Sequence, residues 1–482
     1  MIEMENATQN WTTCLDCEGR GKKSRRIRGK ARHNKKDGSK QSKSEDFIQP
    51  TPRYYIEPCS NCNASGLIQS NTPPIIDKEN YPHIAIIGGG IGGTALAVAC
   101  LHRGIPFTIY ERDSSFDSRS QGYGLTLQQA SKAIEGFGVF SLEGGIISTR
   151  HVIHDPLGEI ISEWGSRNRI KTVAEKPSKR RNIHIARQSL RLELLEQLGG
   201  HNKIKWNHQL VDFKETKEEG VQLNFNVNGE TQTAKADLMV GADGIRSSVR
   251  NLLIGEEATP LRYLGCIVIL GICLLEDIEG AEDSLLDGTT VFQTANGNER
   301  IYMMPYSSDS VMWQLSFPMP EDDAKSLSEK GVEALKKEAC LRTPWHNPIP
   351  QIMAATSETK ITGYPVYDRD LLSTELLEKG NQITLIGDAA HPMSPFKGQG
   401  ANQALLDALA LARGITNGCK PDTKWKEVGI RKSVLTEFET EMLNRSASKV
   451  KDSAAAAKFL HTEIDLSNDG KPRGRHLKRK TS

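Results

Sequence analysis

Residues 84–98 read IAIIGGGIGGTALAV, and this stretch decides the fold. An apolar run from Ile84 to Ile87 breaks into glycines at positions 88, 90 and 93, and a run of helix-forming residues follows. The pattern predicts a buried strand, a tight turn that needs Gly88 and Gly90, and a helix whose N-terminal amides face a phosphate. Gly90 would let the backbone approach that phosphate, and Gly93 would let the helix pack closely on the strand.

The next segment supplies an acidic partner for this turn. A second apolar run, Phe107 to Tyr110, predicts a strand that ends at Glu111, at about the 20-residue offset of a carboxylate that binds a ribose hydroxyl. We add the neighbouring Arg112 to the candidate cofactor-binding residues. Strand, turn, helix and carboxylate together predict a dinucleotide site, and the alternative is a glycine turn with a purely structural role.

Composition and charge narrow the class of protein. The chain has 482 residues and a formal net charge of +2, which argues against a globally basic nucleic-acid binder. Its first residues lack the pattern of a signal peptide, and its longest apolar run, Cys266 to Leu275, is too short to cross a bilayer and predicts a buried strand. We expect a cytoplasmic protein with no membrane span, and the basic stretch 22–36 leaves a nuclear address as the alternative.

Periodicity predicts the other elements. Leucines at 190, 194, 195 and 198 share one face of a helix from Arg187 to Leu198. Further helices are expected at 324–339, 401–413 and 434–460, and strands at 204–213, 221–227, 236–240, 290–294, 300–304, 311–317 and 382–386. The first convincing periodic structure begins only at His83, after a polar extension interrupted by prolines.

Three glycine-containing motifs follow one another along the chain. The turn at 88–93 is followed by GADGIRSSVR at 241–250 and by GDAAHPMSPFKGQGANQALLDA at 387–408. This set resembles the single-component FAD-dependent aromatic hydroxylases, which include para-hydroxybenzoate hydroxylase, kynurenine monooxygenase and the tetracycline-inactivating monooxygenases. The resemblance covers residues 82–460. It implies an α/β fold with a Rossmann-like FAD-binding domain, an inserted mixed β-sheet substrate domain and a C-terminal helix.

Composition and resemblance together divide the chain into segments. The predicted segments are an N-terminal extension at 1–80, an FAD-binding domain at 81–258 and 362–415, a substrate-binding sheet domain at 259–361, a C-terminal helical segment at 416–465 and a basic tail at 466–482. Substrate contacts are expected from the sheet domain. Met303, Met304 and Trp313 in that domain are expected to pack in its core rather than to line the pocket.

The resemblance also assigns cofactor contacts. Asp388 would accept hydrogen bonds from the ribitol chain of a flavin, and the N-terminus of the helix after it would face the flavin pyrimidine edge. The implied cofactor-binding residues in these motifs are Arg119, Gln121, Arg187, Asp243, Gly244, Asp388, Pro395, Gly398, Gly400, Ala401 and Asn402. Asp243 and Gly244 would lie near the pyrophosphate and help to receive NAD(P)H.

Each assignment has a structural alternative. Asp388 could cap a turn, Arg187 could be a solvated first-turn arginine, and Arg246 with Arg250 could be a basic pair on the surface. The loop that carries Arg119 and Gln121 could be a mobile polar loop. His391 is expected to support the structure beside Pro392 rather than to act as a base.

The implied reaction needs no catalytic side chain. Flavin reduced by NAD(P)H would react with O₂ to give a C4a-hydroperoxide, which hydroxylates a small aromatic or polyketide-like substrate. The chain has no second GxGxxG for a nicotinamide domain, which fits a transiently docked NAD(P)H. The alternatives are an epoxidase or dehydrogenase of the same fold, or a flavin-binding regulatory or scaffolding subunit.

Two cysteine repeats precede the first strand. Cys14 to Gly21 matches CxxCxGxG, and Cys59 to Gly66 matches it except for Ala64; both resemble repeats of the zinc-binding module in J-domain chaperones. Four thiolates, Cys14, Cys17, Cys59 and Cys62, suffice for one tetrahedral Zn²⁺ site. The alternatives are unliganded thiols or a rubredoxin-like iron site. The resemblance implies a metal knuckle or a contact for a protein partner, and no chaperone activity.

Overall fold

A five-stranded parallel sheet lies at the centre of the molecule. The computed structural model describes residues 10–26, 54–118, 122–166, 182–216, 219–279 and 283–461, so the predicted contacts of Arg119 and Gln121 fall outside the described residues. The strands follow the order β12-β6-β5-β16-β22. Their bounds are Ile204–Lys205, Phe107–Tyr110, Ile84–Ile87, Leu238–Gly241 and Ile383–Leu385. The strand predicted at 204–213 is therefore two strands, the second being β13 (His208–Thr216).

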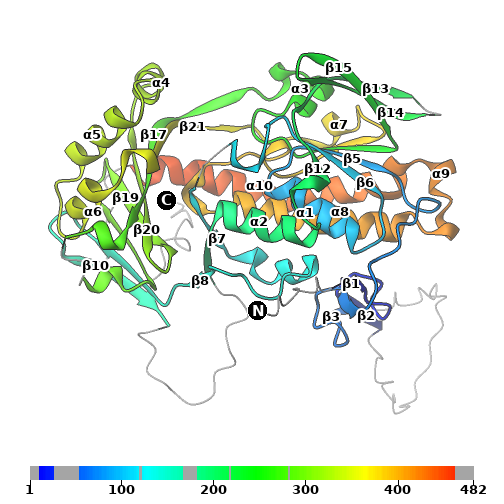
Figure 1. Cartoon of the computed structure of the whole chain (residues 1–482), viewed down its shortest axis with the longest axis horizontal. Coiled ribbons are helices and arrows are strands. Elements are labelled where there is room, and N and C mark those ends of the chain that lie inside the picture. The colour runs from blue at the N-terminus through cyan, green and yellow to red at the C-terminus, as the bar shows by residue number, and fades with distance from the viewer. Residues whose placement is uncertain are drawn as a thin grey trace, which may run out of the picture.

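Four helices pack around this sheet (Figure 1). They are α1 (Ile91–Leu101), α2 (Arg187–Gln197), α8 (Gly400–Gly418) and α10 (Thr436–Phe459). Helix α1 is apolar on every side because it lies against the sheet and against α8, and all its residues from Gly93 to Cys100 are buried. Gly92 faces Ala404 on α8, and a β-carbon there would make ordinary contact with that of Ala404 at 3.5 Å.

Two smaller sheets flank the parallel one. Strands β13, β14 (Gly220–Val227) and β15 (Glu230–Ala236) form an antiparallel sheet. After β15 the chain passes through β16 of the parallel sheet and then forms α3 (Ser248–Ile254). Strand β15 was not predicted because its residues are nearly all polar and exposed. Strands β7 (Gly124–Leu127), β11 (Ile183–Ala186) and β8 (Ile146–Ile147) form the other sheet.

A seven-stranded sheet forms the other half of the body (Figure 1). In sheet order its strands are β10 (Ile160–Gly165), β9 (Arg150–His154), β18 (Thr290–Ala295), β19 (Arg300–Ser307), β20 (Ser310–Pro318), β17 (Leu261–Leu274) and β21 (Ile361–Arg369). Strands β9, β10 and β21 thus come from outside the segment 259–361. Alternation gives the sheet two apolar faces: Met303 and Trp313 pack with helices on one face, and Met304 and Met312 lie on the other.

The helices on this sheet correct one prediction. Helices α4 (Glu321–Glu329), α5 (Val332–Arg342) and α6 (Ile349–Ala355) cover its outer face. The single helix predicted at 324–339 is two helices, because Gly331 between them has a φ of +86°. Among the described residues, no helix has both the length and the apolar character that a membrane span requires.

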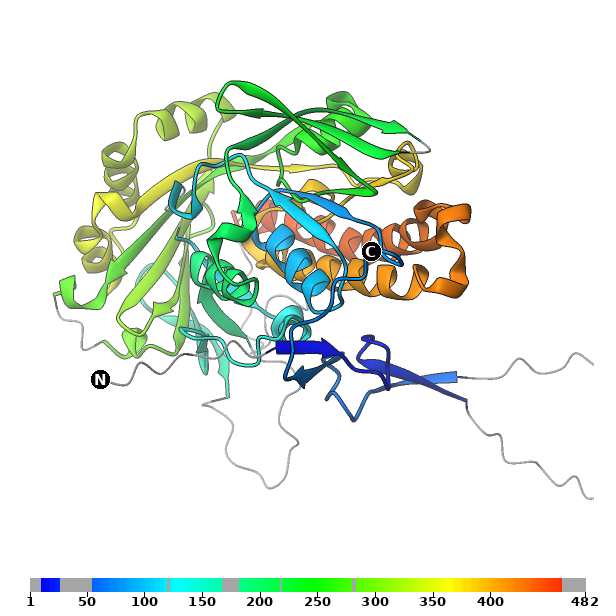
Figure 2. The ribbon, with the colours of Figure 1, turned by 45° about the vertical axis from the view of Figure 1, so that its right-hand side comes forward.

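The N-terminal extension contains ordered structure before His83. Strands β1 (Asn10–Thr13) and β4 (Leu67–Ser70) pair with each other, as do β2 (Lys22–Arg26) and β3 (Tyr54–Pro58). These four strands and the two cysteine repeats form what we call the cysteine module. Figure 2 shows this module under the body, with the β2–β3 ribbon extending away from it. Its core consists of cysteines rather than aliphatic side chains, so hydrophobic periodicity could not reveal it.

Candidate functional site

A cavity of about 1070 Å³ separates the parallel sheet from the seven-stranded sheet. One wall comes from the N-terminal ends of α1 and α8 and from the loop after β22, and the opposite wall from strands β19, β20 and β21. The volume exceeds that of most single-ligand pockets. It therefore has room for part of a large cofactor together with a small substrate.

The glycine turn at the start of α1 is shaped by close backbone contacts. Gly88 has a φ of +108°, and a β-carbon there would stand 2.5 Å from the carbonyl oxygen of Ala242. A β-carbon at Gly93 would stand 1.9 Å from the carbonyl oxygen of Gly88. Gly90 differs, because no protein atom lies within 4 Å of its ideal β-carbon and the residue lines the cavity. Gly88 and Gly93 thus serve packing, and Gly90 leaves a space that a ligand could occupy.

Glu111 holds the same turn from the next strand. Its Oε2 accepts a hydrogen bond of 2.6 Å from the amide of Gly89, and its Oε1 accepts one of 3.1 Å from the amide of Asp113. The carboxylate has further lone pairs, but Glu111 is buried and does not itself line the cavity. Arg112 is exposed and does not line the cavity.

The second motif forms a helix cap beside the cavity. Oδ2 of Asp243 accepts hydrogen bonds from the amides of Ser248 (2.7 Å) and Val249 (3.2 Å) at the start of α3. Its Oδ1 is buried with no partner among the described residues, and burial raises the pKa of the carboxyl group. Gly244 and Arg246 line the cavity. Asp243 itself does not line the cavity, so its side chain acts on the site through the start of α3.

The alternative that Arg250 belongs to a basic pair on the surface is wrong, because Arg250 is fully buried. Its Nη1 donates to the carbonyl oxygens of Ala389 (2.9 Å) and Ala390 (3.0 Å). The guanidinium therefore ties the second motif to the third across 139 residues of sequence. Local sequence carried no sign of this partner, because Arg250 stands in a polar segment.

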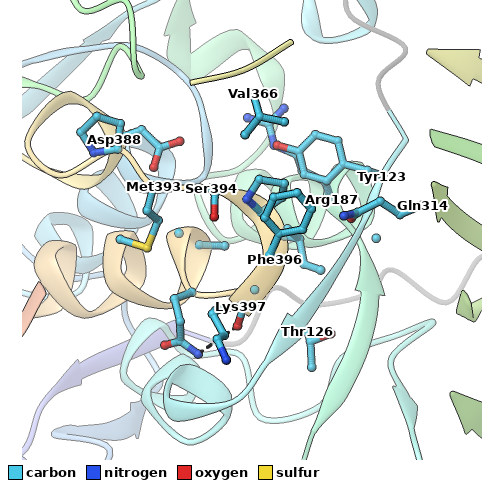
Figure 3. A pocket seen from close by; sticks show the side chains of 18 of the residues that line it. Tyr123, Thr126, Arg187, Gln314, Val366, Asp388, Met393, Ser394, Phe396 and Lys397 are labelled. Carbon is cyan, nitrogen blue, oxygen red and sulfur yellow. Dashed lines mark hydrogen bonds between the residues drawn. The ribbon is translucent and has the colours of Figure 1, made fainter. Parts of the chain in front are cut away.

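Arg187 and Asp388 face the cavity from different elements (Figure 3). Arg187 begins α2 and lies over the ring of Tyr123, 5.3 Å from its centroid. Asp388 follows β22. Its side chain is accessible, and it lines the cavity. The surrounding protein raises the pKa of Asp388 by desolvation, while His391 and Arg187 act in the opposite direction. Both side chains thus line the cavity.

The loop before α8 brings the third motif to the cavity. Pro395, Gly398, Gly400 and Ala401 all line it, and Gly398 has a φ of +58°. Asn402 lies behind them, where its Oδ1 accepts from Gln128 and Ala130 and its Nδ2 donates to Thr126 and Gly398. Asn402 therefore fixes the loop that carries the lining glycines rather than facing the cavity.

His391 belongs to a buried polar network. Its Nε2 lies 2.7 Å from Oδ2 of Asp407, whose Oδ1 accepts a 2.8 Å hydrogen bond from Arg445 on α10. Burial disfavours the imidazolium ion, but the Asp407 carboxylate outweighs this effect and raises the pKa of His391. His391 supports the loop from behind, and sequence analysis missed Asp407 and Arg445, which join it to α8 and α10.

The wall from the seven-stranded sheet is rich in aromatic groups. His151 and Trp164 stack with ring centroids 5.3 Å apart, and Tyr302 and Tyr364 line the same cavity. Phe396 enters from the opposite loop and Gln314 from β20 (Figure 3). Met304 lines the cavity as well, which corrects the expectation that it packs only in the core; Met303 and Trp313 do pack there. Flat aromatic walls suit a planar substrate.

The four cysteines of the extension converge in one buried cluster. The sulfurs of Cys14 and Cys59 lie 3.9 Å apart, those of Cys17 and Cys62 lie 3.6 Å apart, and all four fall within 4.8 Å of one another. Amides turn toward the sulfurs, since Gly21 donates to Cys17 (3.2 Å) and Gly66 to Cys62 (3.3 Å). Four thiols in this geometry can hold one tetrahedral metal ion.

The sequence and the fold are similar to those of known flavoproteins. Residues 82–420 match the family described as FAD binding domain. The chain belongs to this family. Its relatives include proteins named as FAD-dependent monooxygenases, among them one from Arthroderma benhamiae that is 25% identical over 427 residues. The resemblance inferred from the motifs is thus confirmed for family and enzyme class, and the FAD-binding α/β fold is confirmed.

Individual relatives differ in what they act on. Aurachin C monooxygenase/isomerase from Stigmatella aurantiaca is 30% identical over 338 residues, which cover 69% of this chain and 80% of the relative. The chloroplastic zeaxanthin epoxidase of an Oncidium hybrid is 26% identical, and the match spans only 55% of it. The structure of Klebsiella pneumoniae HpxO with FAD and uric acid is similar in fold, with a TM-score of 0.64, 20% identity, and coverage of 80% of this chain and 90% of that one.

The two kinds of glycine in the turn should respond differently to alanine. We expect Gly90→Ala to fold normally and to weaken FAD binding, because its methyl group fills ligand space and meets no protein atom. Gly93→Ala should impair folding itself, because its methyl group meets the Gly88 carbonyl. Flavin fluorescence titration and thermal unfolding of both variants measure the two effects. Equal losses of FAD affinity and of stability in both variants would contradict this assignment.

Proposed function

We propose that FAD extends along the cavity from the N-terminus of α1 to the N-terminus of α8. Gly88, Gly90 and Gly93 would form the turn at the pyrophosphate, and Glu111 would bind the ribose. The N-termini of the two helices would supply amide donors and partial positive charge to the phosphates and to the flavin. Support comes from the open space at Gly90 and from the position of Gly90 and Gly400 on the cavity wall.

The other predicted cofactor residues would act around the flavin. Asp388 would accept hydrogen bonds from the ribitol, and Arg187 would supply positive charge nearby. Pro395, Gly398, Gly400 and Ala401 would shape the loop against the flavin, and Asn402 would hold that loop from behind. The division into an FAD-binding part at 81–258 and 362–415 and a substrate part at 259–361 stays a proposal, with β9, β10 and β21 added to the substrate sheet.

We infer that the protein is a monooxygenase that uses NAD(P)H and O₂ to hydroxylate a small aromatic or polyketide-like substrate. Bound flavin supplies the redox chemistry, in which NAD(P)H, a proton, O₂ and substrate give NAD(P)⁺, water and hydroxylated product. The chain's own residues bind and orient the substrate and exclude water. The observation that carries this proposal is the aromatic wall, including Tyr302 and Tyr364, opposite the two helix N-termini, with Phe396 facing it from the loop before α8.

Epoxidation is the second candidate, because curated relatives include zeaxanthin epoxidases. Stopped-flow absorbance on the FAD-loaded protein with NADPH or NADH tests the proposal. We expect aromatic or polycyclic compounds that fit the cavity to accelerate flavin reduction by NAD(P)H. The reason is that a substrate bound beside the flavin would change how the flavin is presented to the nicotinamide. A flavin that no tested compound causes to reduce faster, and that yields no oxygenated product, would favour the regulatory-subunit alternative.

For the cysteine cluster we propose a structural Zn²⁺ ion. Sulfurs bound tetrahedrally at about 2.3 Å from zinc lie about 3.8 Å from one another. The distances of 3.9 Å and 3.6 Å between paired sulfurs agree with this value. Leu15 and Ile56 are exposed on the module, which supports the proposal of a protein partner there.

Metal analysis distinguishes zinc from the alternatives. We expect one zinc ion per chain, no iron absorption, and loss of the metal in Cys59→Ser, which removes one of four ligands. Cys340→Ser is the matched control, because Cys340 is exposed and lies outside the cluster. A stoichiometric iron content, or a metal content that Cys59→Ser leaves unchanged, would contradict the proposal.

A further inference from the structure

Two arginines lie between the cysteine cluster and the body. Arg413 on α8 donates from Nε to the carbonyl oxygen of Gly19 (3.0 Å) and from Nη2 to that of Ser65 (3.0 Å). Arg103, just after α1, donates from Nη2 to the same Gly19 oxygen (3.4 Å). Arg413 therefore contacts both cysteine repeats, one through Gly19 and the other through Ser65. Gly21 and Gly66 face this guanidinium, and β-carbons there would stand 3.1 Å and 3.3 Å from its Nη2.

The charges of these two arginines have no carboxylate partner. Among the residues that the structure describes, neither guanidinium forms an ion pair with Asp or Glu, and the acceptors are backbone carbonyl oxygens. Burial lowers the pKa of Arg103 to about 9 and that of Arg413 to about 10, so both stay charged at neutral pH. Placing two like charges side by side in a poorly solvated site is unfavourable unless a counterion is present.

A metal–thiolate centre would provide that counterion. Four thiolates and one Zn²⁺ carry a net charge of −2, which matches the two guanidinium groups. We propose that Arg103 and Arg413 are the countercharges of this centre, so that the cysteine module docks firmly on α1 and α8 only while the metal is bound. This inference rests on the zinc proposal. When the metal leaves and the thiols are protonated, the two cations lose their counterion and the docked state is weakened.

The position of the two helices extends this effect to the flavin. Helices α1 and α8 begin at the cavity, near Gly90 and Gly400. Arg103 follows the C-terminus of α1 and Arg413 lies in the C-terminal half of α8, and both contact the module there. Undocking would remove support from the far ends of both helices. We therefore expect metal loss to lower the melting temperature of the body and to speed FAD release, although no cysteine lines the cavity.

The test uses the full-length, FAD-loaded protein in zinc-bound and chelated, reduced forms. Arg413→Gln removes the charge and keeps hydrogen-bond donors, whereas Arg413→Lys keeps the charge. Lys420→Gln is the control, since Lys420 is a cation next to the module that pairs with the exposed Glu18. Zinc affinity is measured by competition with a chromophoric chelator, and stability by thermal unfolding.

The charge account predicts an effect that changes sign with metal occupancy. Arg413→Gln should weaken zinc binding about tenfold, should lower the melting temperature of the zinc form, and should raise that of the metal-free form. Arg413→Lys and Lys420→Gln should stay close to wild type. If Arg413→Gln lowers stability equally in both forms, or if Arg413→Lys is as damaging, the arginines act only as hydrogen-bond donors and the inference is overturned. A wild-type protein that binds no metal would instead refute the zinc proposal itself.

Discussion

The close approach of three backbone segments at the glycine turn determines the rest of this structure. The carbonyl of Gly88 occupies the space that a side chain at position 93 would need, and Ala242 fills the corresponding space at position 88. Only with both contacts in place can α1 begin where β5 ends and point its N-terminus into the cavity. The position of α1 in turn sets that of α8, which packs along it and presents the second helix N-terminus.

Local features of the site were predictable from the sequence, and long-range partners were not. Strand β5, the bounds of β6 and the start of α2 follow from apolar runs and periodicity, because each depends on adjacent residues. The burial of Arg250 depends on the carbonyls of Ala389 and Ala390, and the role of Asn402 depends on a loop more than 270 residues earlier. No periodic signal carries such information.

The sheet domain shows the same limit in another form. Alternation places Met303 and Met304 on opposite faces, but the sequence does not say which face meets the cavity. That depends on how the seven-stranded sheet packs against the flavin-binding half, and on β9 and β10, which join it from an earlier part of the chain. The aromatic wall of the cavity is therefore a product of tertiary arrangement, which explains why three motifs could identify a family and leave the substrate open.

Helices α1 and α8 contact the cysteine module near one end and line the cavity near the other. We infer that a flavin and an aromatic substrate share the cavity and that oxygen from O₂ enters the product. Turnover under isotopically labelled O₂, followed by mass spectrometry of the product, tests this most directly. The account predicts one labelled oxygen atom per product molecule, with about one NAD(P)H consumed for each in a well-coupled reaction. A product that takes its oxygen from water, or NAD(P)H oxidation that yields only reduced oxygen species with every tested substrate, would contradict it.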